Sequence, residues 1–383
     1  MKNIVIFSDG TGQDGGTDNN TNVYKLFNII LNRSPRQISF YDRGIGTGWR
    51  KLTGNIAGRG FSKNVLECYE FIFQNFEQGD KIYLFGFSRG AATVRSLSGF
   101  IHHFGILPKS RVKLIKEAWE IYKIRNDKKR KEVADKFINL NSTMWAQVEF
   151  LGVWDTVAAL GIPNTKIDRI IDWFIPHGFH DFKLSESVNH ACHALAIDDV
   201  RKTFHPVLFE PTQENLQKDP NRKRSLQQVW FMGMHTDVGG GYKEKELSDI
   251  VLEWMLQNAV KHGLHIFNNP KRTIEGRCTP NPNGMMHDAR DKLWKKKIFP
   301  AKQRVWDEKR YGKAVIHESV CLRTTSVDNN EDFDYKPWIL KHKPKIEKWT
   351  HLSDWEKDPE FKKVDNENFL ALDGWCIAVR PDQ

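Results

Sequence analysis

The sequence predicts an α/β fold in which a mainly parallel β-sheet is covered by helices on both faces. Short apolar runs rich in β-branched and aromatic residues alternate with segments whose apolar residues recur at helical spacing. Strands that alternate with helices along a chain form parallel sheets, because each crossover helix returns the chain to the same edge. The 383 residues are 39% hydrophobic and include 24 Phe and 13 Trp, so a large core is available and global disorder is excluded.

The predicted elements follow one another as strand and helix. We expect strands at residues 3–8, 38–41, 81–86, 146–154 and 228–234, and helices at residues 23–30, 65–76, 90–104, 184–195 and 247–263. After about residue 265 the pattern weakens, and Pro, Lys and Trp become frequent. We therefore predict an α/β core over residues 1–265 and a basic, Trp-rich C-terminal extension or cap over residues 266–383.

Composition disfavours several classes of protein. No apolar run approaches the roughly 18 residues of a membrane span, and the N-terminus turns polar too soon for a signal peptide. We therefore expect a cytoplasmic protein, one exported by a leaderless secretion system, or one peripheral to a membrane. Five Cys without a CxxC pair argue against a disulfide scaffold and against a Cys-rich zinc site.

Basic residues are concentrated toward the C-terminus. The formal net charge is +10, and residues 290–350 hold 16 Lys and Arg against 9 Asp and Glu. Such a surface attracts anionic lipid, acidic protein or nucleic acid, and it also serves solubility alone.

The strongest local signal is a G-x-S-x-G motif in the context that a nucleophile elbow requires. Gly86-Phe87-Ser88-Arg89-Gly90 follows an apolar strand and leads into a helix of small residues. Such a tight turn holds the serine in a strained conformation, and the glycines make room for it. The turn also aims free helix amides at a developing oxyanion. Ser88 is therefore the candidate nucleophile, and an ordinary glycine-flanked turn is the alternative.

A serine hydroxyl needs a general base, usually a histidine that a carboxylate orients. In a sheet of this kind both partners are expected at the carboxyl ends of later strands, in the order serine, acid, histidine. Asp155 follows the strand at 146–154, and His235 follows the strand at 228–234. We therefore predict a triad of Ser88, Asp155 and His235. A helix N-cap is the alternative for Asp155, and a structural histidine is the alternative for His235.

Two other residues compete for these roles. Asp237 lies two residues after His235, where it could be the carboxylate or could cap the glycine-rich loop that follows. His317 could be the base if the C-terminal extension completes the site. The imidazole that lies within hydrogen-bond reach of Ser88 would decide between the two histidines.

The loop after the first strand is placed to donate one oxyanion amide. Gly10 or Thr11 is the candidate donor, and the amide of Arg89, just past the nucleophile, is the second. Asp9 is too close to a developing oxyanion to help it. We expect Asp9 to order the loop, or to position the histidine or a water.

Three other patterns do not match a cofactor or metal site. The run from Asp14 to Asn20 is rich in oxygen ligands but follows no EF-hand spacing. The glycine-rich loop at 44–50 lacks both the P-loop and the dinucleotide signatures. His190 and His193 form an H-x-x-H on the predicted helix at 184–195, facing away from its apolar stripe. We interpret them as a surface pair and expect no cofactor and no metal.

Together these motifs resemble an uncharacterised α/β-hydrolase-domain family that includes the bacterial type VI secretion phospholipase effectors. The segments that carry the resemblance, in the family's order, are Phe7-Ser8-Asp9-Gly10-Thr11, Thr21-Asn22-Val23, residues 41–47, 86–91, 150–157, 229–242 and 316–320. The resemblance implies an α/β-hydrolase-like fold and a Ser-Asp-His hydrolase of ester bonds, with phospholipids the substrate class of some members. It carries the triad onto Ser88, Asp155 and His235.

The resemblance leaves the substrate and the biological target open. We favour a phospholipase effector that acts on phospholipid at an anionic membrane surface, with an immunity or regulatory protein as a further partner and no nucleic acid. An apolar segment within residues 160–180 follows the acid strand and is a candidate lid, with core packing as the alternative. Hydrolysis of another ester, an amide or a thioester stays an alternative, as does a non-enzymatic binding module with a vestigial pocket.

Overall fold

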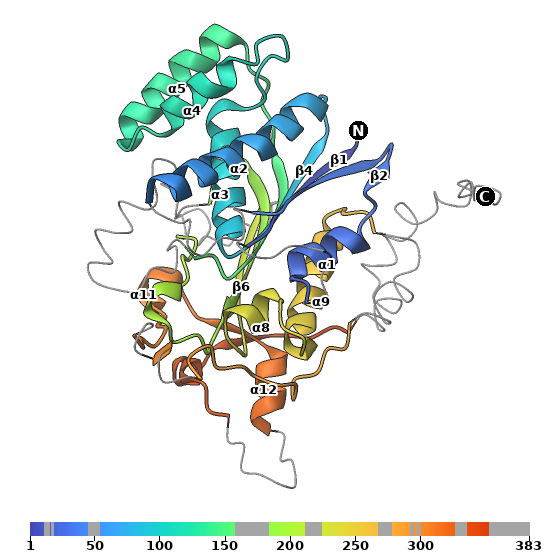
Figure 1. Cartoon of the computed structure of the whole chain (residues 1–383), viewed down its shortest axis with the longest axis vertical. Coiled ribbons are helices and arrows are strands. Elements are labelled where there is room, and N and C mark those ends of the chain that lie inside the picture. The colour runs from blue at the N-terminus through green and yellow to red at the C-terminus, as the bar shows by residue number, and fades with distance from the viewer. Residues whose placement is uncertain are drawn as a thin grey trace, which may run out of the picture.

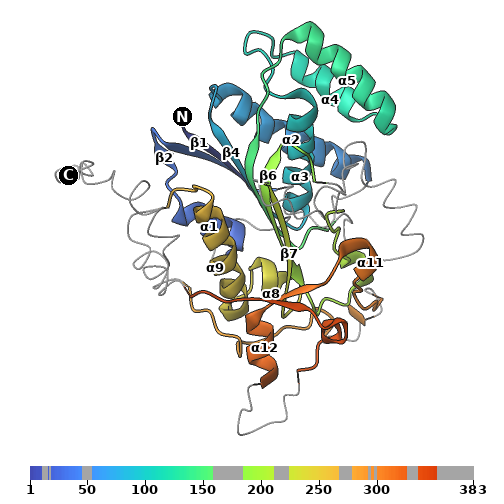
Figure 2. The ribbon, with the colours of Figure 1, turned by 180° about the vertical axis from the view of Figure 1, so that it is seen from behind.

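A single sheet organises the chain. The computed structural model describes residues 1–10, 16, 19–44, 54–157, 184–210, 224–266, 278–291, 295–296, 300–325 and 335–351. These residues form a nine-stranded sheet with helices on both sides (Figures 1 and 2). The strands are β1 Asn3–Ser8, β2 Arg33–Ser34, β3 Gln37–Asp42, β4 Lys81–Phe87, β5 Val148–Trp154, β6 Val188–Ala196, β7 Ser225–Phe231, β8 Val315–His317 and β9 Lys345–Glu347.

The main helices connect these strands. They are α1 Asn22–Ile29, α2 Gly54–Asn75, α3 Arg89–Phe104, α4 Leu114–Tyr122, α5 Asp127–Asn141, α8 His235–Gly239, α9 Glu246–Lys261, α11 Glu308–Tyr311 and α12 Glu318–Thr325. Short 3-10 turns η2 Lys202–Phe204 and η4 Trp338–His342 lie in the later connections.

The sheet has the order β2-β3-β1-β4-β5-β6-β7-β8-β9. Each neighbouring pair is parallel except β2 with β3, which is a short antiparallel pair at the edge. The carboxyl ends of β4, β5 and β7 therefore lie along the same edge of the sheet. The prediction of an α/β-hydrolase-like, mainly parallel sheet is confirmed.

Two hydrophobic cores lie on the two faces of the sheet. Alternate residues of β1 point to opposite sides, because side chains alternate along a strand. Ile4 and Ile6 pack with the buried faces of α2, α3, α4 and α5, whereas Val5 and Phe7 pack with α1 and α9. Figures 1 and 2 show α2 and α3 on one side of the strands and α1 and α9 on the other. Helices therefore cover both faces of the sheet, as the alternation of strands and helices along the sequence predicted.

One predicted helix is wrong. A helix was expected at residues 184–195, but Val188–Ala196 forms strand β6 between β5 and β7. A central strand of a parallel sheet is buried on both of its faces, so it carries apolar residues on both faces. Such a strand lacks the two-residue alternation of apolar and polar residues that marks a half-buried strand. The remaining apolar spacing of Leu184, Val188, Ala191 and Leu195 then fitted a helix by coincidence.

The described part of the C-terminal extension belongs to the same sheet as the core. β8 pairs with β7 through Ile316 and Trp230, and β9 pairs with β8. The candidate lid at 160–180 lies outside the described residues. Within the described ranges, no helix combines the length and the apolarity that a membrane span needs.

Candidate active site

Ser88 occupies a strained turn between β4 and α3. Its backbone has φ 58° and ψ −117°, a region that side chains rarely adopt. The turn passes so close to β1 that a Cβ on Gly90 would overlap the carbonyl oxygen of Ser8. A Cβ on Gly86 would likewise meet the backbone of Gly90. The glycines of the motif are therefore needed for close backbone approach, as a nucleophile elbow requires.

Arg89 is the first residue of α3, directly after Ser88. The first amides of a helix have no partner within the helix and carry its positive dipole end. The Arg89 amide is thus in the position expected of an oxyanion donor, and the helix axis starts at the nucleophile.

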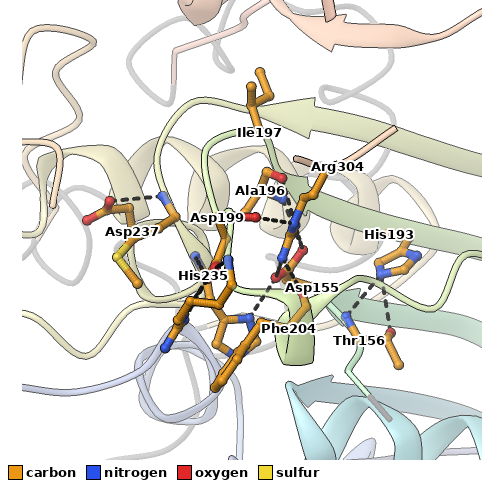
Figure 3. Close-up of polar contacts among 12 residues, drawn as sticks. Asp155, Thr156, His193, Ala196, Ile197, Asp199, Phe204, His235, Asp237 and Arg304 are labelled. Carbon is orange, nitrogen blue, oxygen red and sulfur yellow. Dashed lines mark hydrogen bonds and ion pairs between the residues drawn. The ribbon is translucent and has the colours of Figure 1, made fainter. Parts of the chain in front are cut away.

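Asp155 and His235 form a buried hydrogen-bonded pair. Asp155 follows β5, and His235 is the first residue of α8, just after β7. The Nδ1 of His235 lies 2.6 Å from Oδ2 of Asp155 (Figure 3). The imidazole packs against Phe87, with ring centroids 4.6 Å apart, and this places it beside the elbow that carries Ser88. The two residues named from their strand ends are therefore brought together by the parallel sheet.

The carboxylate of Asp155 is fully enclosed by donors. Arg304 donates from Nη1 to Oδ1 at 2.6 Å and from Nη2 to Oδ2 at 2.8 Å, and the amide of Ala196 donates to Oδ1 at 3.1 Å. Burial raises the pKa of Asp155, but the charge of Arg304 and the bonds from His235 and Arg304 outweigh it and hold that pKa well below its usual range. Asp155 is therefore ionised at any pH near neutrality.

The His235 imidazole is held by ring packing and by a backbone hydrogen bond. Phe204 packs in a T-shaped arrangement with the ring at 5.1 Å between centroids, and the guanidinium of Arg201 lies 3.5 Å from the centre of the Phe204 ring. The His235 amide donates to Asp199, which also pairs with Arg201. Burial lowers the pKa of His235 below its ordinary value, and the bond to Asp155 acts in the opposite direction. The imidazole is therefore neutral at pH 7 and can accept a proton.

Asp9 organises the loop that follows β1. Its Oδ2 accepts hydrogen bonds from the hydroxyls of Thr21 at 2.6 Å and Tyr41 at 2.7 Å, and its Oδ1 accepts from the Gly10 amide at 2.7 Å. Burial raises the pKa of Asp9 to about 6, against the effect of these bonds. The expected loop-ordering role fits these contacts. The Gly10 amide, however, is already engaged by Asp9 and is not a free oxyanion donor in this structure, and Thr11 lies outside the described residues.

Asp237 caps a helix and does not orient His235. Its Oδ2 accepts from the amide of Met234, the N-cap of α8, at 3.0 Å, and its Oδ1 lies 2.6 Å from Nδ1 of His287. Neither of the two roles considered for Asp237 is the one observed, because it caps the start of α8 through Met234 and not the glycine-rich loop that follows.

His317 lies on β8 and is bonded elsewhere. Its Nδ1 is 2.8 Å from the hydroxyl of Ser319, and its ring stacks on Phe231 with 4.8 Å between centroids. The imidazole that meets Asp155 is that of His235.

The H-x-x-H pair is not on a helix and is not a surface pair. His193 is fully buried on β6, where its Nε2 lies 3.2 Å from the amide and the hydroxyl of Thr156. His190 lies near the start of β6 and stacks on His262 with 3.4 Å between centroids. In the part of the chain that the structure describes, no group of three or more His, Cys, Asp or Glu is arranged to hold a metal ion.

Sequence reasoning missed two charged residues of the site. Asp199 follows β6, at the same sheet edge as Asp155, and would have been found had β6 been recognised as a strand. Arg304 lies 149 residues from Asp155, and nothing near it in the sequence marks it as part of the site.

Comparison with known families finds a match over most of the chain. The family described as "T6SS, Phospholipase effector Tle1-like, catalytic domain" matches residues 2–258, which include Ser88, Asp155 and His235. The chain belongs to this family. The matched region of this Tle1-like domain covers β1 to β7 and most of α9, and it ends before Arg304.

Individual relatives share between 16% and 32% sequence identity with this chain. The Saccharomyces cerevisiae uncharacterized protein YEL023C is 32% identical over 235 residues, 55% of this chain, and the chain spans only 33% of that protein. The crystal structure of an uncharacterized protein from Pseudomonas aeruginosa is 16% identical, with a TM-score of 0.44 over 71% of this chain and 47% of that chain. The structure of the Tle1 effector bound to the VgrG spike of the type 6 secretion system is 20% identical, with a TM-score of 0.36 over 63% of this chain and 51% of that chain.

Proposed function

We propose that this chain is a serine hydrolase that cleaves carboxylic esters through an acyl-enzyme, and that phospholipids are its substrate class. The observation that carries the proposal is the buried Asp155–His235 pair, 2.6 Å apart, packed against the strained turn that presents Ser88. Membership of a family of phospholipase effector catalytic domains supports the substrate class.

Each residue has a defined part in the proposed reaction. His235 takes the proton of the Ser88 hydroxyl through Nε2 while the serine oxygen attacks the ester carbonyl. Asp155 stabilises the imidazolium through Nδ1, and the Arg89 amide stabilises the oxyanion. His235 then gives its proton to the leaving alcohol. In the second half, His235 activates a water that releases the carboxylic acid from Ser88.

The charge of the chain supports a membrane surface as the place of action. The net charge is +10, and basic side chains such as Lys128, Lys129 and Lys131 of α5 are exposed. Basic residues attract anionic lipid head groups at about 1 kcal/mol each near the surface. We expect vesicles that contain phosphatidylglycerol to be hydrolysed faster than vesicles of phosphatidylcholine alone, measured by fatty acid release at low and high salt. Hydrolysis of short soluble esters, with no hydrolysis of either kind of vesicle, would instead favour an esterase of another substrate class.

The nucleophile is tested by Ser88→Ala. We expect this variant to keep its thermal unfolding midpoint and to lose at least about 10⁴-fold in ester turnover, because the attacking oxygen is gone. A fluorophosphonate probe should label the wild type at Ser88, seen by peptide mass spectrometry, and should not label the variant. Full esterase activity in Ser88→Ala, or a wild type that resists the probe, would reject the proposed reaction.

The base is tested by comparing His235→Gln with His317→Gln. Only the first removes an imidazole bonded to Asp155, so it should slow fluorophosphonate labelling of Ser88 by at least about 10³-fold, whereas the second should leave the labelling rate within about threefold. Circular dichroism of both variants checks that they are folded, since both imidazoles are buried. The opposite ranking would assign the base to His317.

A further inference from the structure

The guanidinium of Arg304 is buried against the catalytic acid candidate. The side chain has no exposed surface, and it makes a two-pronged contact with both carboxylate oxygens of Asp155 (Figure 3). Its remaining donors reach carbonyl oxygens, with Nη1 2.6 Å from Ala196, Nη2 2.6 Å from Phe204 and Nε 3.1 Å from Asp199. Five hydrogen bonds therefore fix the plane of the guanidinium, and through it the plane of the Asp155 carboxylate.

Arg304 reaches the site on a segment that follows the family-matched region. Residues 300–304 run beside residues 200–205: the Lys202 amide donates to Pro300 at 2.9 Å, and the Lys302 amide donates to Val200 at 2.7 Å. Arg201 and Ala301 also form a β-bridge. The strap defined by residues 300–306 is anchored at its far end by Trp306, whose indole donates to Gly312 and packs on Trp230. The strap thus has the contacts needed to hold the guanidinium in one place.

We propose that Arg304 is a positioning residue that acts through Asp155, keeping this carboxylate ionised and turned so that Oδ2 faces His235, and limiting how strongly Asp155 attracts a proton to the imidazole. The inference rests on the proposed hydrolase function. The inference adds that the cation that balances the negative charge of Asp155, Arg304, comes from the C-terminal part of the chain, beyond residues 2–258.

The physical reason is that the Asp155 carboxylate contacts two groups, the Arg304 guanidinium and the His235 imidazole. An ionised Asp155 alone would favour the imidazolium form of His235 strongly in a buried site, and a permanently protonated His235 could not accept the Ser88 proton. Burial lowers the pKa of His235, and Arg304, by sharing the carboxylate charge, limits how far Asp155 acts against this effect. The other titratable or charged groups near the pair are Asp198 and Asp199 after β6, Arg201, His193 on β6 and His205 beside the strap. Arg201 and Asp199 are paired with each other, so Arg304 is the cation that directly contacts Asp155.

A purely structural ion pair would behave differently from a positioning residue. If Arg304 only compensated a buried charge, its loss would lower stability and would reduce activity equally at all pH values. If it sets the charge balance of the triad, its loss must also move the pH dependence of Ser88 reactivity upward. The midpoint of that pH dependence separates the two roles.

The experiment measures the rate of fluorophosphonate labelling of Ser88 against pH in the full-length protein. Arg304→Met removes both the positive charge and the two-pronged contact with Asp155. Arg304→Lys keeps the positive charge and removes the two-pronged contact. We expect a wild-type midpoint below pH 6.5, a midpoint at least about one pH unit higher in Arg304→Met, and one within about half a unit of wild type in Arg304→Lys. Plateau rates should fall about tenfold or more in both variants, because the carboxylate is no longer held in plane.

Controls keep the result decisive. Arg310→Met is the matched control, since Arg310 follows the strap and its side chain is 54% exposed in an ion pair with Glu210; it should label as wild type does. If circular dichroism shows that Arg304→Met does not fold, Arg304→Lys alone decides the result. An Arg304→Lys variant that labels at the wild-type rate at every pH would overturn the inference. An unchanged midpoint in a folded Arg304→Met would also overturn it.

The two proposals fail in distinguishable ways. A wild type that resists the probe at every pH overturns the proposed hydrolase, not the role of Arg304. The His235 midpoint is then measured directly by NMR titration of its ring signals in wild type and Arg304→Met. A higher midpoint in the variant supports the inference, and an equal one overturns it.

Discussion

Two residues of the site hold backbone conformations that side chains rarely adopt. Ser88 has φ 58° and Asp155 has φ 37°, and they are two of the four non-glycine residues with positive φ in the described ranges. Each such conformation costs about 1–3 kcal/mol and persists only where its surroundings fix it. The G-x-S-x-G motif predicted the first, because flanking glycines mark it. No local pattern marks the second, at Asp155, whose carboxylate contacts His235 and Arg304.

The packing of the elbow is tested by Gly90→Ala. A Cβ at this position would overlap the backbone carbonyl of Ser8, and backbone cannot move aside as the end of a flexible side chain can. We expect the free energy of unfolding, from urea denaturation, to fall by about 3 kcal/mol or more. Gly10→Ala is the matched control, because its Cβ would lie 3.5 Å from Phe87 and Ser88, and it should cost under about 1 kcal/mol. Similar losses in the two variants would contradict the predicted close approach.

At the scale of the elements, strands rich in β-branched and aromatic residues were easier to predict than β6, which contains three Ala and two His. Residues 3–8 were predicted as a strand, and β1 has these bounds, whereas β6 was predicted as a helix. β6 lies between β5 and β7 and is buried on both faces, so its sequence carries no alternation. The same error placed His193 on a surface, although it is one of the fully buried side chains of β6.

The burial of His193 on β6 predicts a specific pH dependence of stability. Burial lowers the pKa of His193 to about 3, far below its ordinary 6.5. The folded state then binds fewer protons than the unfolded state between these values, so this group destabilises the fold as pH falls through that window. His193→Gln lacks the effect, and the stability advantage of wild type over the variant should shrink by about 2 kcal/mol between pH 7 and pH 4.5. Urea denaturation at the two pH values measures it, and a constant difference would show that His193 is not a buried neutral imidazole.

At the scale of the whole molecule, the described C-terminal segments belong to the same sheet as the family-matched region. β8 and β9 extend the sheet beyond β7, and the strap at 300–306 brings Arg304 to Asp155 (Figure 3). The change in composition near residue 265 was a real feature of the sequence, but the sheet continues across it. The composition of a segment indicates its exposure and its charge, but it does not indicate which strand of the sheet the segment pairs with.

This continuity is tested by a pair of substitutions on adjacent strands. Ile316 of β8 is 1% exposed, and its register partner Ile346 of β9 is 51% exposed. We expect Ile316→Asp to lower the free energy of unfolding by about 3 kcal/mol or more, since it buries an unpaired carboxylate, and Ile346→Asp to change it by under about 1 kcal/mol. Thermal and urea unfolding of the full-length variants measure this. A small effect at Ile316 would show that the C-terminal strands are not part of the cooperative core.

The sequence by itself determined the features that local chemistry and strand periodicity encode. It placed Ser88 in a strained turn, and it placed Asp155 and His235 at strand ends that a parallel sheet brings to one edge. Only the tertiary structure decided that Asp155 contacts His235, that Asp237 caps a helix, that Gly10 is engaged by Asp9, and that Arg304 contacts both carboxylate oxygens of Asp155. The reason is physical. Backbone conformation follows from neighbours in the chain, whereas pairing of buried charges depends on contacts between distant segments, 80 residues apart for Asp155 and His235 and 149 for Asp155 and Arg304.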